Sequence, residues 1–274
     1  PSAIMGIFAV LGVYFLVKEI FQKDRQHRVL GMLTSFLLAI SPWHLQFSRI
    51  AFEANSGLTL NIWGVYALLR GLTSPVWMSI SAFLFGVSLY AYHSERVFVP
   101  LLICAMAFIW RKEIFRDWKK LVVPICIGLI TVLPLLPVLF DKTTLTRLQG
   151  TSALADKTGL LMLSVGKLQA DSAAHNPFGA AFENRRLVYI QKIAEGYISH
   201  FSLRWLFLLG DNDRHHAPDN ALLYLWELPF IFWGMLALWK KGGRSAALVF
   251  TWFFIAPIAA SPTSETPHAI RTLV

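Results

Sequence analysis

The chain has 274 residues, of which 55% are hydrophobic and 15% are charged, and its mean hydropathy is +0.53. The charged share is far below the quarter that is usual in soluble domains, which excludes an ordinary soluble domain. The net charge of +9 does not indicate nucleic-acid binding, because the basic residues cluster at the ends of apolar segments. The composition predicts an all-α polytopic membrane protein.

Eight apolar segments are predicted to be transmembrane helices, in a single domain that covers residues 1–274. A long polar loop at 141–221 separates the sixth segment from the seventh. Because the chain starts and stops inside apolar sequence, we expect it to be truncated at both ends. The predicted helices are 3–21, 29–42, 55–69, 76–92, 97–110, 121–140, 222–239 and 245–260.

The basic residues predict the orientation of these helices. With eight crossings, the connections on one side carry 13 Lys and Arg, and the short connections on the other side carry 3. The richly basic side is expected to face the cytoplasm. The opposite, extracytoplasmic side then holds segments 43–54, 93–96, 141–221 and 261–274.

The sequence shows no P-loop, dinucleotide fingerprint, paired-cysteine metal spacing or serine nucleophile elbow, so a soluble nucleotide site is not supported.

The first outer segment begins after Pro42, which is expected to end the preceding helix. Arg49 and Glu53 are four residues apart and would share one face of a short helix. They could form a structural ion pair at the mouth of the helix. Alternatively, Arg49 could bind a phosphate while Glu53 serves as a base, a metal ligand or a group that orients the acceptor.

The second outer segment contains two tyrosines and an arginine at a helix mouth: Tyr90, Tyr92 and Arg96. An aromatic belt with a snorkelling arginine is one interpretation. The other is a second cation for an anionic head group, with the tyrosines stacking on a sugar.

The long loop and the last outer segment add further ionisable residues. Residues 182–203 have helical periodicity and predict an amphipathic helix, followed by His200 and the cluster Gly210–His216. In the last segment, His268 and Arg271 follow Pro267, which could open a short helix.

Two chemistries could use these residues. A divalent metal could bind Glu53, Asp211 and His215, with Asp213 and His216 nearby, although the spacing matches no metal motif. Alternatively, the arginines could stabilise the phosphate of a lipid-linked donor while a carboxylate deprotonates an acceptor hydroxyl.

Four segments, in order along the chain, resemble one known family. They are Ser41–Asn55, Tyr90–Pro100, Tyr197–His216 with the following Leu225–Pro229, and Pro267–Arg271. The resemblance is to GT-C fold glycosyltransferases that use polyprenyl-phosphate sugars, in glycosyltransferase family 39. Protein O-mannosyltransferases and the aminoarabinose transferases of lipid A are relatives in this group.

The resemblance implies an inverting transferase in a bacterial plasma membrane, acting on its extracytoplasmic face. It would move a sugar from a polyprenyl-phosphate donor to a lipid, glycan or protein hydroxyl. The family's main catalytic Asp is expected upstream of residue 1, which would leave this segment alone inactive, and Glu53 is the candidate catalytic carboxylate here. The candidate substrate-binding residues are Arg49, Asn55, Tyr90, Tyr92, Arg96, His200, Asp211, Arg214, His215, His268 and Arg271. A transporter or flippase for an anionic or lipid-linked substrate is the alternative.

Overall fold

All regular elements in the described part of the chain are helices, which confirms the all-α prediction. The computed structural model describes residues 1–50, 52–139, 157–174, 185–211 and 220–272, together with residues 141, 146, 150 and 152. The first half of the chain contains α1 (Ser2–Ile20), α2 (His27–Ile40), α3 (Pro42–Arg49), α4 (Ala54–Gly71), α5 (Pro75–Ala91), α6 (Glu95–Ile109), α7 (Arg111–Ile114), η1 (Phe115–Leu121), α8 (Val122–Val132), η2 (Leu133–Leu135) and α9 (Leu136–Leu139).

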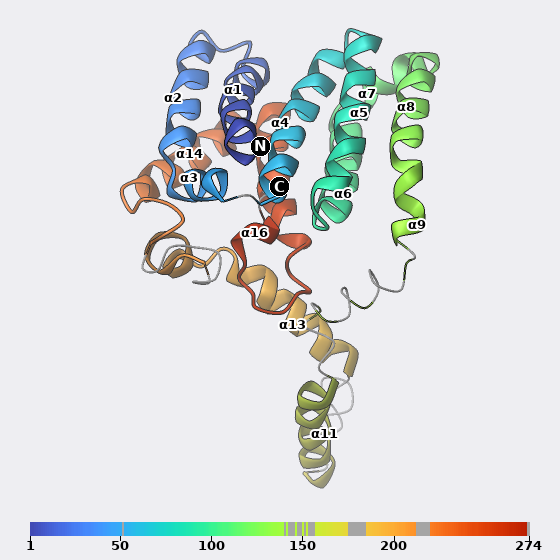
Figure 1. Cartoon of the computed structure of the whole chain (residues 1–274). Helices are drawn as coiled ribbons and strands as arrows, with labels where there is room; N and C mark the ends of the chain where they lie inside the picture. The colour runs from blue at the N-terminus through green and yellow to red at the C-terminus, as the bar shows by residue number, and fades with distance from the viewer. Residues whose placement is uncertain are drawn as a thin grey trace.

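The second half of the chain contains helices of 13 to 17 residues and several short helical turns. They are α11 (Lys157–Ala173), α13 (Arg185–Ser199), the π-helical turn η3 (Trp205–Leu209), α14 (Glu227–Lys241), α15 (Gly243–Ile255), η4 (Ala256–Ile258) and α16 (Ala269–Thr272). In Figure 1, α11 and α13 extend away from the bundle at the end where α3, α9 and α16 lie.

Each of the eight predicted apolar segments coincides with a helix. Two helical stretches of the described residues are by themselves long and apolar enough to cross a membrane, Ser2–Ile20 and Arg111–Val138. A third span would be the pair α2 and α3, which meet at an angle of 60°, and α5 and Gly243–Ile258 are shorter apolar helices. The membrane-protein class is therefore confirmed, whereas the count of eight crossings stays a prediction.

Two predicted boundaries have clear physical causes. Helix α2 ends at Ile40 and Pro42 is the first residue of α3, as expected from a residue that lacks a backbone N–H. The predicted start of the seventh helix at 222 is wrong, because α14 begins only at Glu227. Residues before it make loop contacts instead: the backbone N–H of Trp43 donates to the carbonyl of Leu222 at 3.3 Å.

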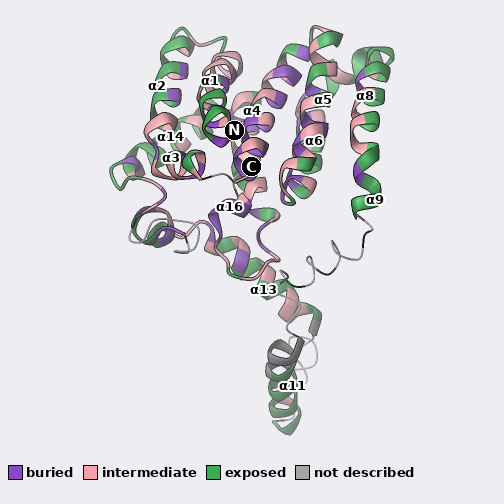
Figure 2. Ribbon diagram, viewed as in Figure 1, coloured by how far each residue is buried: buried purple, intermediate pink, exposed green. Residues whose placement is uncertain are grey.

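Helix α4 is the centre of the bundle, with α1 and α5 packed against it. Small residues let these helices approach closely, and polar side chains cross between them. The Ser81 hydroxyl donates to the Gly64 carbonyl at 2.8 Å, and the Trp63 indole donates to the Phe8 carbonyl at 3.0 Å. Figure 2 shows buried residues concentrated on α4 and exposed residues along α2 and α8, as expected for helices whose outer faces meet lipid.

A polar network lies inside the bundle where α4, α5 and α6 meet. Glu95 is completely buried at the start of α6, and its carboxylate accepts a hydrogen bond from the Asn61 amide at 2.7 Å. The Ser88 hydroxyl donates to the Asn61 side-chain oxygen at 2.8 Å. Gly57 lies directly beside this carboxyl, since a Cβ there would be 2.2 Å from Glu95 Oε1. The network fixes the first turn of α6 against the other two helices.

The close approach at Gly57 predicts that Gly57→Ala destabilises the protein. The added methyl group must displace a buried carboxyl, which should lower the free energy of unfolding by about 1–3 kcal/mol. Gly234→Ala on α14 is the matched control, because a Cβ there has nothing within 4 Å. Thermal unfolding of the purified proteins in detergent measures both, and equal unfolding midpoints for the two variants would contradict this packing.

Candidate functional site

The four predicted outer segments meet at one end of the bundle. Tyr224, which follows the long loop, donates its hydroxyl to the Ile40 carbonyl at 3.1 Å, beside the first segment. Tyr197 on α13 donates to the Phe254 carbonyl at 2.9 Å, close to the last segment. The first of these hydrogen bonds joins residues 184 positions apart in the chain, and the second joins residues 57 positions apart.

His200 and Asp211 hold the backbone of the last outer segment. The Nε2 atom of His200 accepts a hydrogen bond from the His268 backbone N–H at 3.2 Å, and Asp211 Oδ2 accepts one from the Ala269 N–H at 3.0 Å. His200 Nδ1 lies 2.7 Å from the Gly196 carbonyl, which fixes the neutral Nδ1–H tautomer. Both side chains are buried, so these two acceptors form a clamp on residues 268–269.

The clamp places Arg271 beside Tyr92. Arg271 is buried and donates from its terminal nitrogen to the Ser264 carbonyl at 2.6 Å, while its Nε–H has no hydrogen-bond partner among the described residues. Burial raises the pKa of the Tyr92 hydroxyl, the positive charge of Arg271 partly offsets this, and the nearby Glu53 carboxylate raises the pKa further. Arg271, Tyr92 and Glu53 are therefore one electrostatic cluster, which we call the outer cluster.

The predicted shared helix of Arg49 and Glu53 is wrong. Helix α3 ends at Arg49, the backbone of Ile50 is extended, and Glu53 occupies the N-cap position of the next helix, α4, without a side-chain capping hydrogen bond. Both side chains are exposed, and the ion pairs of the described residues do not include one between them. Only Glu53 joins the outer cluster.

Three other candidates make structural contacts. Asn55 is completely buried and donates to the Ser2 carbonyl at 2.9 Å, which links α4 to α1, and its predicted contact with substrate stays a prediction. The Tyr90 hydroxyl donates to the Thr131 carbonyl of α8 at 2.7 Å, and the predicted role of Tyr90 in substrate binding also stays a prediction. Arg96 donates from Nε to the Leu89 carbonyl at 3.4 Å. Burial lowers the pKa of the neighbouring His93, and the charges of Arg271 and Arg96 lower it further.

Part of the predicted site lies outside the described residues. Arg214 and His215 belong to this part, as do Asp213 and His216. Within the described ranges, no three His, Cys, Asp or Glu side chains come together in a way that could hold a metal. A metal shared by Glu53, Asp211 and His215 remains a prediction.

Sequence reasoning missed two residues that shape this end. Glu95 was not among the predicted site residues, yet its carboxyl is completely buried at the start of α6. Gly196 gave no sequence signal, but a Cβ there would be 2.4 Å from the Ser261 carbonyl, so α13 can touch the last outer segment only with glycine at this position.

Comparison with known protein families matches residues 1–139 to the dolichyl-phosphate-mannose-protein mannosyltransferase family. The match covers just over half of the 274 residues and includes α1 to α9, with Glu53 and Tyr92. The chain belongs to this family. No curated protein and no solved structure matches it.

Membership of the mannosyltransferase family confirms the resemblance read from the sequence. The chain is a membrane glycosyltransferase of the class that draws on a polyprenyl-phosphate sugar donor. The matched region ends at residue 139, so the clamp and Arg271 lie beyond it. Their association with Tyr92 and Glu53 is a finding of the structure.

The neutral state of His200 predicts a pH-dependent stability of the clamp. Burial lowers the pKa of His200 below its ordinary value of 6.5, and backbone hydrogen bonds only partly oppose this. Because the pKa of His200 is lower in the folded state than in the unfolded state, neutral His200 contributes fully to the stability of the folded protein above pH 6.5. This contribution is lost as the pH falls through the folded-state pKa.

The temperature of half-unfolding should therefore decrease as the pH is lowered from about 7.5 to about 5.5. The free energy of unfolding should decrease by at most about 1.4 kcal/mol per pH unit. His200→Gln, which cannot titrate, should have a flatter profile in the same thermal unfolding series. A variant profile as steep as that of the natural protein would show that His200 is not responsible.

Proposed function

We propose that the outer cluster binds the phosphate of a polyprenyl-phosphate sugar on the extracytoplasmic face of the membrane. The observation that carries this proposal is the buried Arg271, whose Nε–H has no hydrogen-bond partner in the described residues and whose positive charge acts on the Tyr92 hydroxyl. A phosphate oxygen supplies the acceptor that this donor lacks, and arginine is well suited to phosphate geometry. The family name gives mannose as the sugar and a protein as the acceptor to test first.

The cluster supports a single-displacement reaction with inversion. An acceptor hydroxyl oxygen attacks the anomeric carbon, the bond from that carbon to the phosphate oxygen breaks, and polyprenyl phosphate leaves. Arg271 and Tyr92 stabilise the negative charge that develops on the leaving phosphate. Glu53 is exposed beside them and orients the acceptor hydroxyl or receives its proton.

Charge distribution supports the extracytoplasmic assignment. Ion pairs join the helix ends opposite the outer cluster: Arg70 with Glu19 at 3.7 Å, and Lys241 with Asp24 at 2.8 Å. These are the ends that carry the excess of basic residues, which the positive-inside rule places in the cytoplasm. Transport, the alternative, is less favoured because the cluster lies at the helix ends and the family catalyses sugar transfer.

Arg271→Ala in the full-length protein should lower kcat/KM for sugar transfer by roughly 100-fold or more, as loss of a charge-stabilising donor does in other enzymes. Tyr92→Phe should cause a smaller loss, since one hydrogen bond is removed, and Glu53→Gln should lower kcat. Transfer from a radiolabelled polyprenyl-phosphate sugar measures all three.

Arg204→Ala is the matched control, because Arg204 is an exposed arginine in the outer loop with no part in the cluster. It should retain full activity. Normal transfer by Arg271→Ala and Glu53→Gln, with unfolding midpoints like that of the natural protein, would remove both residues from the site.

A further inference from the structure

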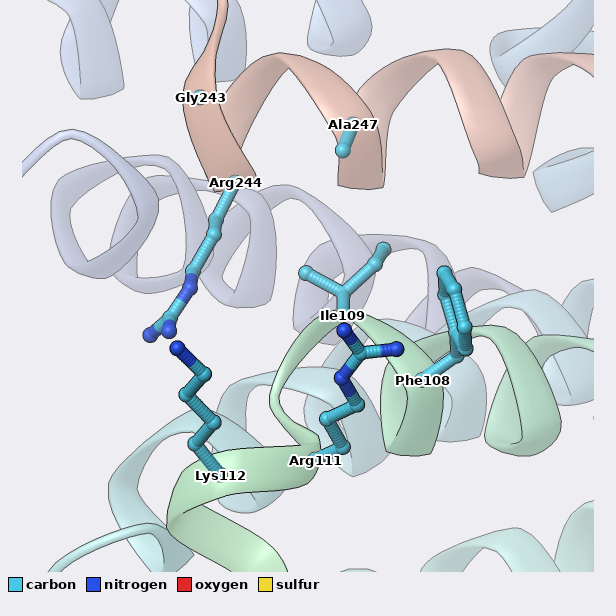
Figure 3. Close-up of a pocket in the computed structure, with 7 residues that line it drawn as sticks. All are labelled: Phe108, Ile109, Arg111, Lys112, Gly243, Arg244 and Ala247. Atoms are coloured by element: carbon cyan, nitrogen blue, oxygen red, sulfur yellow. The ribbon is translucent and has the colours of Figure 1, made fainter.

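A basic cleft lies between the end of α6, the helix α7 and the start of α15. Its volume is about 340 Å³, and Figure 3 shows its lining: Phe108, Ile109, Arg111, Lys112, Gly243, Arg244 and Ala247. Three of these seven residues are cations and none is acidic. The remaining ones supply an apolar wall beside the charges.

The cations of this cleft are only partly neutralised. Arg244 pairs with Glu113 at 2.5 Å, whereas Arg111 and Lys112 appear in no ion pair of the described residues. Arg111 stacks over the Phe108 ring at 4.9 Å, which holds its guanidinium at the apolar wall. In Figure 3 the side chains of Lys112 and Arg244 extend toward the same side of the cleft, so both positive charges favour a bound anion there.

The backbone at the start of α15 adds to the positive potential. Gly242 and Gly243 have φ values of 59° and 77°, and no side chain caps the first turn of this 13-residue helix. Its first N–H groups and the positive end of its dipole are therefore available beside the three cations. A Cβ at either glycine would meet nothing within 4 Å, so the cleft is open here.

The cleft is remote from the outer cluster. Helix α6 runs from Glu95, near the cluster, to Ile109 at the cleft, and α15 runs back from Gly243 toward the last outer segment. The two helices pack against each other, with Phe98 and Trp252 ring centroids 5.8 Å apart. A ligand in the cleft would bridge both helices at their far ends.

We propose that this cleft binds the phosphate head group of an anionic phospholipid. The three cations and the α15 amides contact the phosphate, and the first part of an acyl chain packs on Phe108, Ile109 and Ala247. A lipid fits better than free phosphate, because the apolar wall continues along α6 and α15, whose outward faces carry exposed Phe108 and Phe253. Basic pockets between membrane helices are suited to such head groups. Lipid binding in this cleft is independent of sugar transfer at the outer cluster.

The test is a lipid titration of the purified full-length protein in detergent micelles, read by native mass spectrometry and by the unfolding midpoint. Phosphatidylglycerol should bind and raise the midpoint, whereas phosphatidylcholine and inorganic phosphate should not. The double variant Arg111→Gln with Lys112→Gln should weaken phosphatidylglycerol binding by about tenfold or more, since each cation near an anionic surface contributes about 1 kcal/mol.

The matched control is Arg116→Gln with Lys119→Gln, which removes the same two residue types from η1, outside the cleft. It should change the affinity less than about threefold, a loss of well under 1 kcal/mol. Equal losses in both double variants would show general surface attraction and overturn the proposal, as would a full stabilising effect of inorganic phosphate alone. Because Arg111 and Lys112 are exposed, both double variants should unfold like the natural protein in phosphatidylcholine micelles, and Lys112→Gln alone is a milder second variant.

Discussion

The outer end of this protein depends on two buried acceptors that hold a short stretch of backbone. His200 and Asp211 receive the N–H groups of His268 and Ala269, and Arg271 follows within the same turn. Without these bonds, two backbone donors would be buried without partners, which costs about 1–3 kcal/mol each. The clamp therefore determines where the arginine lies, although neither acceptor needs to touch a substrate.

The second constraint is the anchoring of the opposite partner, Tyr92. It directly follows α5, and two residues separate it from the buried Glu95, the first residue of α6. The bond from Asn61 to Glu95 fixes that first turn against α4, so Tyr92 is held from both sides. Two polar networks, one in the loop region and one in the bundle, thus determine a single contact between Tyr92 and Arg271.

The sequence predicted the positions of the helices more accurately than the contacts between their side chains. Hydropathy placed all eight apolar helices, and helical periodicity placed α13, because both depend on neighbouring residues alone. The pairing of Arg49 with Glu53 failed because a helix break at Ile50 intervenes, and Asn55 and Tyr90 turned toward other helices. The clamp was not foreseen, although His200, Asp211 and His268 were each singled out, since their meeting depends on how a long loop folds back.

A buried arginine at the mouth of a membrane bundle is costly unless its charge is compensated. Around Arg271 the compensation is incomplete: the Ser264 carbonyl accepts a hydrogen bond from the guanidinium, the Tyr92 hydroxyl lies within its electrostatic influence, and the Glu53 carboxylate, which also acts on Tyr92, is exposed. A carboxylate tightly paired with the arginine would block a phosphate, whereas no carboxylate at all would retain the product. The arrangement instead leaves the Nε–H of Arg271 without a partner in the described residues, so this donor suits the phosphate oxygen of the proposed sugar donor.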